Sequence, residues 1–284
     1  MNTPSLLIDG LAFAEAPRWH DGALWFSDFF QRQVFSADAQ GRTRVVAEVA
    51  HQPSGLGWLP DGRLLVVSMT DHRLMRLDAS GLVPVAELGA FATGLCNDMV
   101  VDAHGRAYIG NFGFDLFAEP LQRRPAALVL VTPEGQTRVV ADALEFPNGM
   151  VITPDGGTLI VAETFARRLT AFRIGADGSL HERRVWAELG KLTPDGICLD
   201  AEGAVWVASP RTNEFARVRE GGLIVQRIAS ERQAIACALG GSDGRRLFMV
   251  SGLVRPAEVS LADRAARIHW LDVGVPAAAE PVRA

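Results

Sequence analysis

Lysine, cysteine and clustered positive charge are scarce in this sequence. Lys191 is the only lysine among 28 basic residues, and 33 acidic residues bring the formal net charge to −5. The arginines are scattered, so we expect no basic face of the kind that binds nucleic acid. The three cysteines, Cys96, Cys198 and Cys237, lie far apart and form no CxxC pair. Their odd number suits a reducing compartment and argues against a disulfide framework.

Long apolar runs are missing as well. No run reaches the roughly 18 apolar residues of a membrane-spanning helix, and the first residues lack the pattern of a secretory signal. We therefore expect a cytoplasmic protein without membrane or nucleic-acid partners, either a monomer or a weak homodimer. With 48% hydrophobic and 21% charged residues, the chain can fold around a large core.

The sequence does contain one motif that recurs six times: a short apolar strand, a turn with glycine, and a second apolar strand. Segments such as ALWFSD, LLVVSM and TLIVAE are rich in branched and aromatic residues and are bounded by Gly, Asp or Pro. The turn glycines follow one another after 40, 43, 51, 47 and 41 residues, at Gly22, Gly62, Gly105, Gly156, Gly203 and Gly244. Glycine suits such turns because it tolerates positive φ. A period of this length with several strands is typical of a β-propeller.

We therefore predict an all-β fold, a six-bladed β-propeller with four-stranded antiparallel blades and one central metal site. A single domain is expected over residues 1–284. A strand at about residues 5–10 should close the last blade beside the segment ARIHWLDV, and a C-terminal tail should follow over about 274–284. No segment shows a sustained helical pattern, and the nearest candidate, residues 256–267, is short.

The turn glycines also locate the entrance of the central channel. One position of the repeat lies eight residues before the turn glycine in blades two to six, and seven residues before it in the shorter first blade. It is occupied in chain order by Glu15, Ser54, Asn97, Asn148, Asp195 and Ala236. Inner strands line a propeller channel, so these side chains should meet near its axis. Five of the six carry oxygen and two are carboxylates, whose repulsion a cation would relieve.

Asn-Gly and Asp-Gly are also turn signals, which offers an alternative interpretation of Asn148-Gly149 and Asp195-Gly196. A turn there would leave the following strands too isolated to pair, so we favour the ring. Oxygen ligands suit a hard divalent cation. We expect Ca²⁺ first, with Zn²⁺, Mn²⁺ or Mg²⁺ as alternatives.

Four segments in order, AEAPRW, CNDMVVD, FPNGMVIT and PDGICLD, resemble the regucalcin/gluconolactonase family of six-bladed propellers. The resemblance covers about residues 5–272. It implies one divalent metal held by Glu15, Asn148 and Asp195, and hydrolysis of sugar-acid lactones.

The same resemblance implies that Asn97 and Asp98 contact the substrate. Relatives that act on gluconolactone carry an arginine two residues before the matching asparagine, where this chain has Leu95. The resemblance therefore implies lactone hydrolysis more firmly than it implies a sugar lactone as substrate.

The residues suit lactone opening on chemical grounds too. A metal with three protein ligands keeps open positions, and it can polarise an ester carbonyl and stabilise the oxyanion. Asp195 is the candidate general base and Glu15 the alternative.

Further substrate contacts are expected at the rim. Ser54 and His51 belong to blade two, and Phe114 and Arg124 to a long loop over residues 112–126, which also contains Phe117. Such a loop on an active face often covers the substrate; the alternative is a solvated loop whose phenylalanines pack on neighbours.

The leading hypothesis is a metal-dependent lactonase with a small lactone or ester as substrate. Two alternatives remain open, a hydrolase of organophosphates or other esters on the same ring, and a non-catalytic propeller that binds calcium or another ligand.

Overall fold

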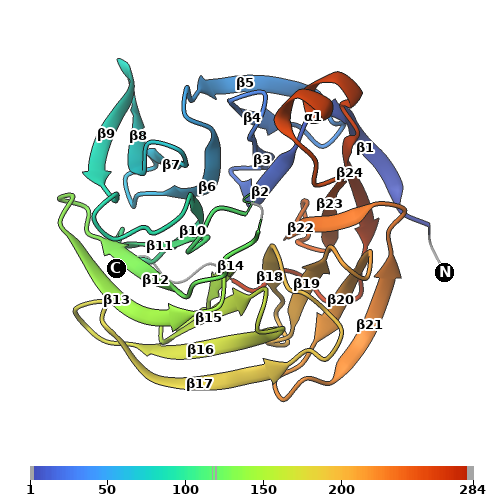
Figure 1. Cartoon of the computed structure of the whole chain (residues 1–284). Coiled ribbons are helices and arrows are strands. Elements are labelled where there is room, and N and C mark those ends of the chain that lie inside the picture. Colours follow the sequence, from blue (N-terminus) through green and yellow to red (C-terminus); the bar gives the residue numbers. More distant parts are fainter. Residues whose placement is uncertain (1–2, 117, 119, 280–284) are drawn as a thin grey trace.

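A computed structural model describes residues 3–116, 118 and 120–279 of the chain. It contains six four-stranded antiparallel sheets arranged around a central axis (Figure 1). This confirms the predicted six-bladed propeller.

The first three blades follow the chain in order. Blade one contains β2 (Ala14–His20), β3 (Ala23–Asp28), β4 (Gln33–Ala37) and β5 (Thr43–Glu48). Blade two contains β6 (Pro53–Trp58), β7 (Leu64–Ser68), β8 (Arg73–Asp78) and β9 (Gly81–Glu87). Blade three contains β10 (Cys96–Val101), β11 (Ala107–Asn111), β12 (Ala126–Val131) and β13 (Thr137–Leu144).

The other three blades complete the ring. Blade four contains β14 (Pro147–Ile152), β15 (Thr158–Glu163), β16 (Arg168–Ile174) and β17 (Leu180–Glu188). Blade five contains β18 (Ile197–Leu199), β19 (Val205–Ser209), β20 (Glu214–Val218) and β21 (Ile224–Ala229). Blade six contains β22 (Gln233–Gly240), β23 (Arg246–Gly252), β24 (Ala266–Asp272) and β1 (Ser5–Leu11), so the first strand of the chain pairs with the last.

Each inner strand contacts the inner strands of both neighbouring blades, and together they surround the channel. All six turn glycines of the repeat have positive φ, between 69° and 87°, as their place in tight hairpins requires. The Asn148-Gly149 pair lies inside β14 and makes no turn. Glycine is needed there for space, because a Cβ on Gly149 would lie 2.6 Å from the Ile197 nitrogen of the next blade.

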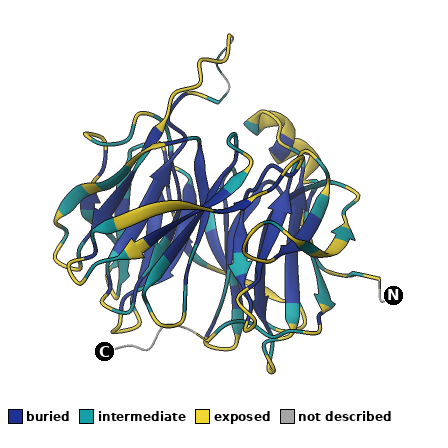
Figure 2. Cartoon of the chain, turned by 90° about the horizontal axis from the view of Figure 1, so that it is seen from below, coloured by how far each residue is buried: buried dark blue, intermediate teal, exposed yellow. Residues whose placement is uncertain are grey.

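The two faces of the disc differ. The loop after β11 and the helix α1 (Ala257–Asp263) rise from the same face in Figure 2. The middle strands, such as β7 and β19, are buried along their whole length because neighbouring blades cover both of their sides. Within the described ranges, no helix is long and apolar enough to cross a membrane.

Candidate functional site

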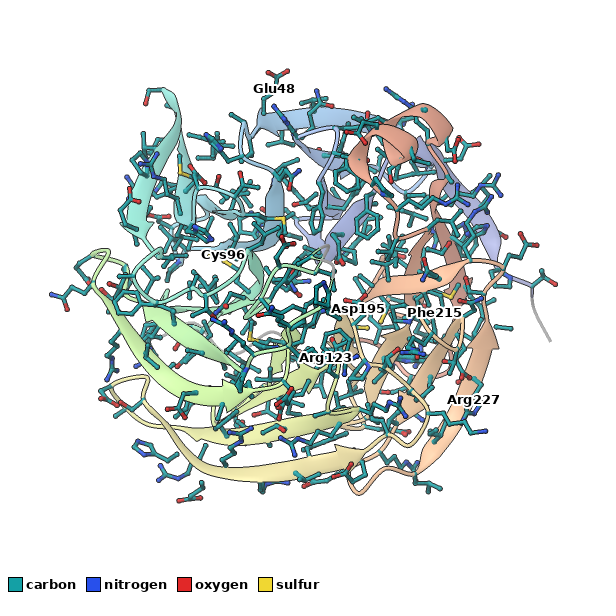
Figure 3. The ribbon with its side chains drawn as sticks, in the orientation of Figure 1. Glu48, Cys96, Arg123, Asp195, Phe215 and Arg227 are labelled. Atoms are coloured by element: carbon teal, nitrogen blue, oxygen red, sulfur yellow. The ribbon has the colours of Figure 1, made fainter. Side chains whose placement is uncertain are left out.

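Four of the six predicted ring residues line one cavity of about 280 Å³ on the axis, namely Glu15, Asn97, Asn148 and Asp195. The first three lie at the starts of β2, β10 and β14, and Asp195 stands just before β18. All four side chains are buried, and Asp195 lies near the centre of the ring in Figure 3. The repeat thus brings side chains that are up to 180 residues apart to one floor.

A chain of hydrogen bonds crosses this floor from blade to blade. Ser54 Oγ donates to Asn97 Oδ1 (3.3 Å), and Asn97 Nδ2 donates to Asn148 Oδ1 (3.1 Å). Asn148 Nδ2 donates to Thr164 Oγ1 (3.3 Å), which donates its one proton to the Pro194 carbonyl (2.7 Å). Because that hydroxyl proton is committed, Thr164 can only accept from Asn148. The network therefore fixes the orientation of the Asn148 amide.

The floor holds two buried carboxylates, Glu15 and Asp195. Burial, followed by the negative charge of Asp195, raises the pKa of Glu15 well above its ordinary value. Burial, followed by the charge of Asp98, does the same to the pKa of Asp195, against a hydrogen bond from Asn148. Neither Glu15 nor Asp195 forms an ion pair with a basic side chain in the described part of the chain. Two such carboxylates repel each other when both are charged, and either a proton or a bound cation relieves that repulsion.

The ligand chemistry fits a hard divalent cation. Glu15, Asn148 and Asp195 can each offer a side-chain oxygen as a metal ligand, and such cations prefer oxygen ligands. In the described residues, no group of three or more His, Cys, Asp or Glu is placed to hold a metal ion. A cation at this floor would therefore need the Asn148 amide oxygen besides the two carboxylates.

Asp98 does not line the cavity and has a partner of its own. Its Oδ1 accepts from Arg18 Nη2 (2.7 Å) and from the Met99 N–H (2.8 Å). Burial raises the pKa of Asp98 in spite of the Arg18 charge. The pair joins β2 of blade one to β10 of blade three.

We expect Arg18→Met to lower the free energy of unfolding by about 2 kcal/mol, because it leaves Asp98 buried without its cation. Urea unfolding measures this loss. Arg173→Met is the matched control, because Arg173 pairs with Glu182 on the surface, where such pairs contribute less than about 1 kcal/mol. Equal losses in the two variants would contradict the structural role of the pair.

The remaining sequence-predicted contacts lie around the cavity. Ser54 is buried outside the cavity lining and donates a hydrogen bond to Asn97. The Nδ1 atom of His51 lies 3.2 Å from Thr70 Oγ1. The neighbouring residue, Gln52, lines the cavity instead. Phe114 packs behind the wall, with its ring 5.8 Å from that of Phe146. The exposed Arg124 lines a separate hollow along the loop after β11.

That loop is partly packed and partly exposed. Phe112 and Phe114 are buried, whereas residues 120–125 are exposed. Arg123 lies over the ring of Phe165 at 4.1 Å and sits near the centre of Figure 3. Phe117, which the sequence also placed in this loop, lies outside the described residues, as do 280–284 of the C-terminal tail.

The sequence of residues 13–252 matches the model of a protein family, described as the SMP-30/gluconolactonase/LRE-like region. The chain belongs to this family. Among its relatives, chicken (Gallus gallus) regucalcin is 24% identical over 251 residues, 86% of this chain and 84% of the relative. The 6-deoxy-6-sulfogluconolactonase of Pseudomonas putida is 24% identical over 280 residues, 94% of each chain.

Solved structures share the fold across almost the whole chain. A calcium-binding protein, regucalcin, from Agrobacterium tumefaciens superposes with a TM-score of 0.81 at 21% identity and covers 100% of both chains. A gluconolactonase from Xanthomonas campestris superposes with a TM-score of 0.75 at 22% identity, covering 97% of this chain and 96% of the other.

Sequence reasoning missed Thr164 and most of the aromatic wall of the cavity. The loop over residues 112–126, which it assigned to the substrate, does contribute Phe112 and Leu116 to that wall. Thr164 directly follows the strand TLIVAE, at the level of the entrance. The wall could have been found by one further step with the same repeat. The residues two positions before five ring residues all line the cavity: Phe13, Gln52, Leu95, Phe146 and Thr193.

Proposed function

We propose that the protein is a metal-dependent lactonase, in which Glu15, Asn148 and Asp195 hold one divalent cation, Ca²⁺ first among the candidates. The observation that carries this proposal is the pair of buried carboxylates on the cavity floor without a basic partner among the described residues. Membership of a family that includes gluconolactonases supports lactones as the substrate class.

The reaction adds water to the lactone and opens its ring. The water oxygen bonds to the carbonyl carbon while Asp195 accepts a proton from that water. The bond between the carbonyl carbon and the ring oxygen then breaks. The ring oxygen takes up the proton, which gives a hydroxy acid. A bound divalent cation would supply polarisation of the carbonyl oxygen and stabilisation of its developing charge.

Other residues orient this arrangement. Asn97 and Thr164 bind opposite ends of the Asn148 amide and hold its oxygen in one direction. The buried floor keeps bulk water from the carboxylates, which strengthens their interaction with a cation.

Chelation should remove the activity. We expect hydrolysis of a lactone panel, followed with a pH indicator, to fall to the uncatalysed rate after EDTA treatment and dialysis. Calcium, magnesium, manganese and zinc are then added back one at a time, and at least one should restore the rate. The restoring metal should also stabilise the fold, by about 2.7 kcal/mol at a hundred times its dissociation constant.

The outcomes separate the candidate functions. Undiminished hydrolysis after chelation would contradict metal dependence. A phosphotriester hydrolysed faster than every lactone would replace the proposed substrate class. Thermal stabilisation by calcium without turnover of any substrate would point to a non-catalytic binding protein.

A further inference from the structure

The cavity above the floor is unusually rich in phenylalanine. Its 21 lining residues make up less than a tenth of the chain, yet they include six of the fourteen phenylalanines. These six are contributed by three blades: Phe13, Phe29, Phe30, Phe112, Phe146 and Phe165. Met69, Leu95 and Leu116 extend the same wall. Most of what a bound molecule would touch above the carboxylates is therefore apolar.

The aromatic rings pack on one another in two groups. The Phe13 ring lies 5.3 Å from that of Phe29. On the side of blades three and four, the Phe146 ring lies 4.7 Å from that of Phe112 and 5.0 Å from that of Phe165. Packed rings form a firm wall, whereas isolated exposed rings could turn aside.

Phe146 is held in a conformation that is costly for its residue type. Its φ is +59°, in the left-handed region that a bulky side chain rarely adopts. The segment is fixed by Glu145, whose N–H donates to the buried Glu163 carboxylate (2.8 Å), and by the Thr164 N–H, which donates to the Phe146 carbonyl (3.1 Å). Gln52, at the equivalent position of blade two, also has positive φ (+65°), and both residues line the cavity.

The polar groups of the upper cavity are few, and some of them are already bonded within the chain. Thr193 Oγ1 accepts from a backbone N–H (3.3 Å), and Gln233 Oε1 accepts from another (2.7 Å). Arg255 donates to a carboxylate at 2.6 Å. In the described part of the chain, Gln52 and Arg211 are left without a side-chain hydrogen bond. Hydroxyl groups of a substrate that face the six phenylalanines would lose hydrogen bonds to water without replacement, which is unfavourable.

We propose that the preferred substrates are lactones whose ring carries an apolar alkyl or aryl substituent, and not polyhydroxylated lactones. This inference rests on the proposed function, and it assigns the substituent to the wall of Phe13, Leu95, Phe146 and Phe165. The reaction itself is unchanged, with water adding to the carbonyl carbon and the ring oxygen leaving as an alcohol. When the ester group reaches the carboxylate floor, the apolar substituent moves out of water and into contact with the aromatic wall, which is favourable.

Three γ-lactones with the same five-membered ring test this proposal: 5-phenyl-γ-butyrolactone, unsubstituted γ-butyrolactone and D-ribono-1,4-lactone. The full chain, loaded with the metal that supports activity, is assayed with each lactone. We expect kcat/KM for the phenyl lactone to exceed the values for both others by at least about tenfold, as burial of one phenyl group implies. The lactam 5-phenyl-2-pyrrolidinone should compete with substrate at least about tenfold better than 2-pyrrolidinone.

A variant and its control locate the effect. Leu95→Arg places a charge in the wall and should lower kcat/KM for the phenyl lactone by about tenfold or more, and change the value for ribonolactone less. Leu223→Arg makes the same change at an exposed position, 62% accessible, and should alter neither value. Circular dichroism and thermal melting check that both variants fold; if Leu95→Arg does not, the comparison of lactones on the unmodified protein still decides.

The outcomes distinguish this inference from the function on which it rests. Turnover of ribonolactone as fast as, or faster than, the phenyl lactone overturns the inference and leaves lactone hydrolysis intact. Absence of turnover with all three lactones and every added metal overturns the proposed function, and the inference with it.

Discussion

Asp195→Asn should lower kcat for lactone hydrolysis at least about a thousandfold at saturating metal. The substitution keeps the shape of the side chain and its place on the floor but removes the group that accepts the proton from water. It also removes one of the two carboxylate ligands. A loss of this size is typical when an essential group of a hydrolytic site is replaced. Measurement of kcat over a range of metal concentrations separates weakened metal binding from a lost chemical step.

The stability of the same variant should not fall. Asp195 is buried close to the negative charges of Glu15 and Asp98, so a neutral side chain relieves repulsion in the metal-free protein. We expect the metal-free melting temperature to stay level or rise. Asp9→Asn is the charge-matched control, because Asp9 lies exposed on β1 away from the cavity. A kcat near normal in Asp195→Asn would exclude Asp195 as the base.

The fold and the residues of the cavity floor could be predicted because the sequence repeat determines both the number of blades and the position of each ring residue. Each turn glycine marks one hairpin, and residues at the same distance before the glycine come to similar heights on the axis. This holds although the inner strands range from three residues in β18 to eight in β22. The position of Asn97 or Asn148 therefore follows from counting, without knowledge of its contacts. In the shorter first blade, the ring residue Glu15 lies seven residues before its glycine, one fewer than in the other blades.

Only the part of the wall that stands two positions before the ring residues follows from the same counting. The phenylalanines of the wall lie in loops before or after the strands, where neither a period of two nor a hairpin signal sets the direction of a side chain. Phe146 faces the cavity with the help of a positive φ, which is not expected of phenylalanine from sequence. The Arg18–Asp98 contact joins residues that are 80 positions apart in the sequence, and no local pattern indicates how their side chains are oriented.

Glu163 joins the stability of blade four to the shape of the cavity. Its side chain is fully buried at the end of β15, and its two oxygens accept from Arg168 (2.9 and 3.1 Å) and from the Glu145 N–H (2.8 Å). Arg183 approaches the same carboxylate at 3.3 Å. The Glu145 bond reaches the residue directly before the strained Phe146, so this buried carboxylate helps to hold the wall in place.

Glu163→Gln should lower the free energy of unfolding at pH 7 by about 3 kcal/mol, because it leaves a partly buried guanidinium without its counter-charge. Glu87→Gln is the control, since Glu87 pairs with Arg73 at an exposed site and should cost less than about 1 kcal/mol. Urea unfolding of both variants measures the difference. A loss in Glu163→Gln no larger than that in Glu87→Gln would show that the buried pair contributes nothing beyond a surface pair.

The pH dependence of the same difference tests its electrostatic origin. Burial alone would raise the pKa of Glu163, but hydrogen bonds from Arg168, Thr170 and the Glu145 N–H prevail and lower it below its ordinary value. A carboxylate with a lowered folded-state pKa contributes stability above its unfolded-state pKa, about 4.3, and loses that contribution as the pH falls through the folded value. The stability difference between the unmodified protein and Glu163→Gln should therefore be constant from pH 7 to about pH 5 and shrink below about pH 4.3. A difference that stays constant in acid would mean that the variant loses packing and not charge.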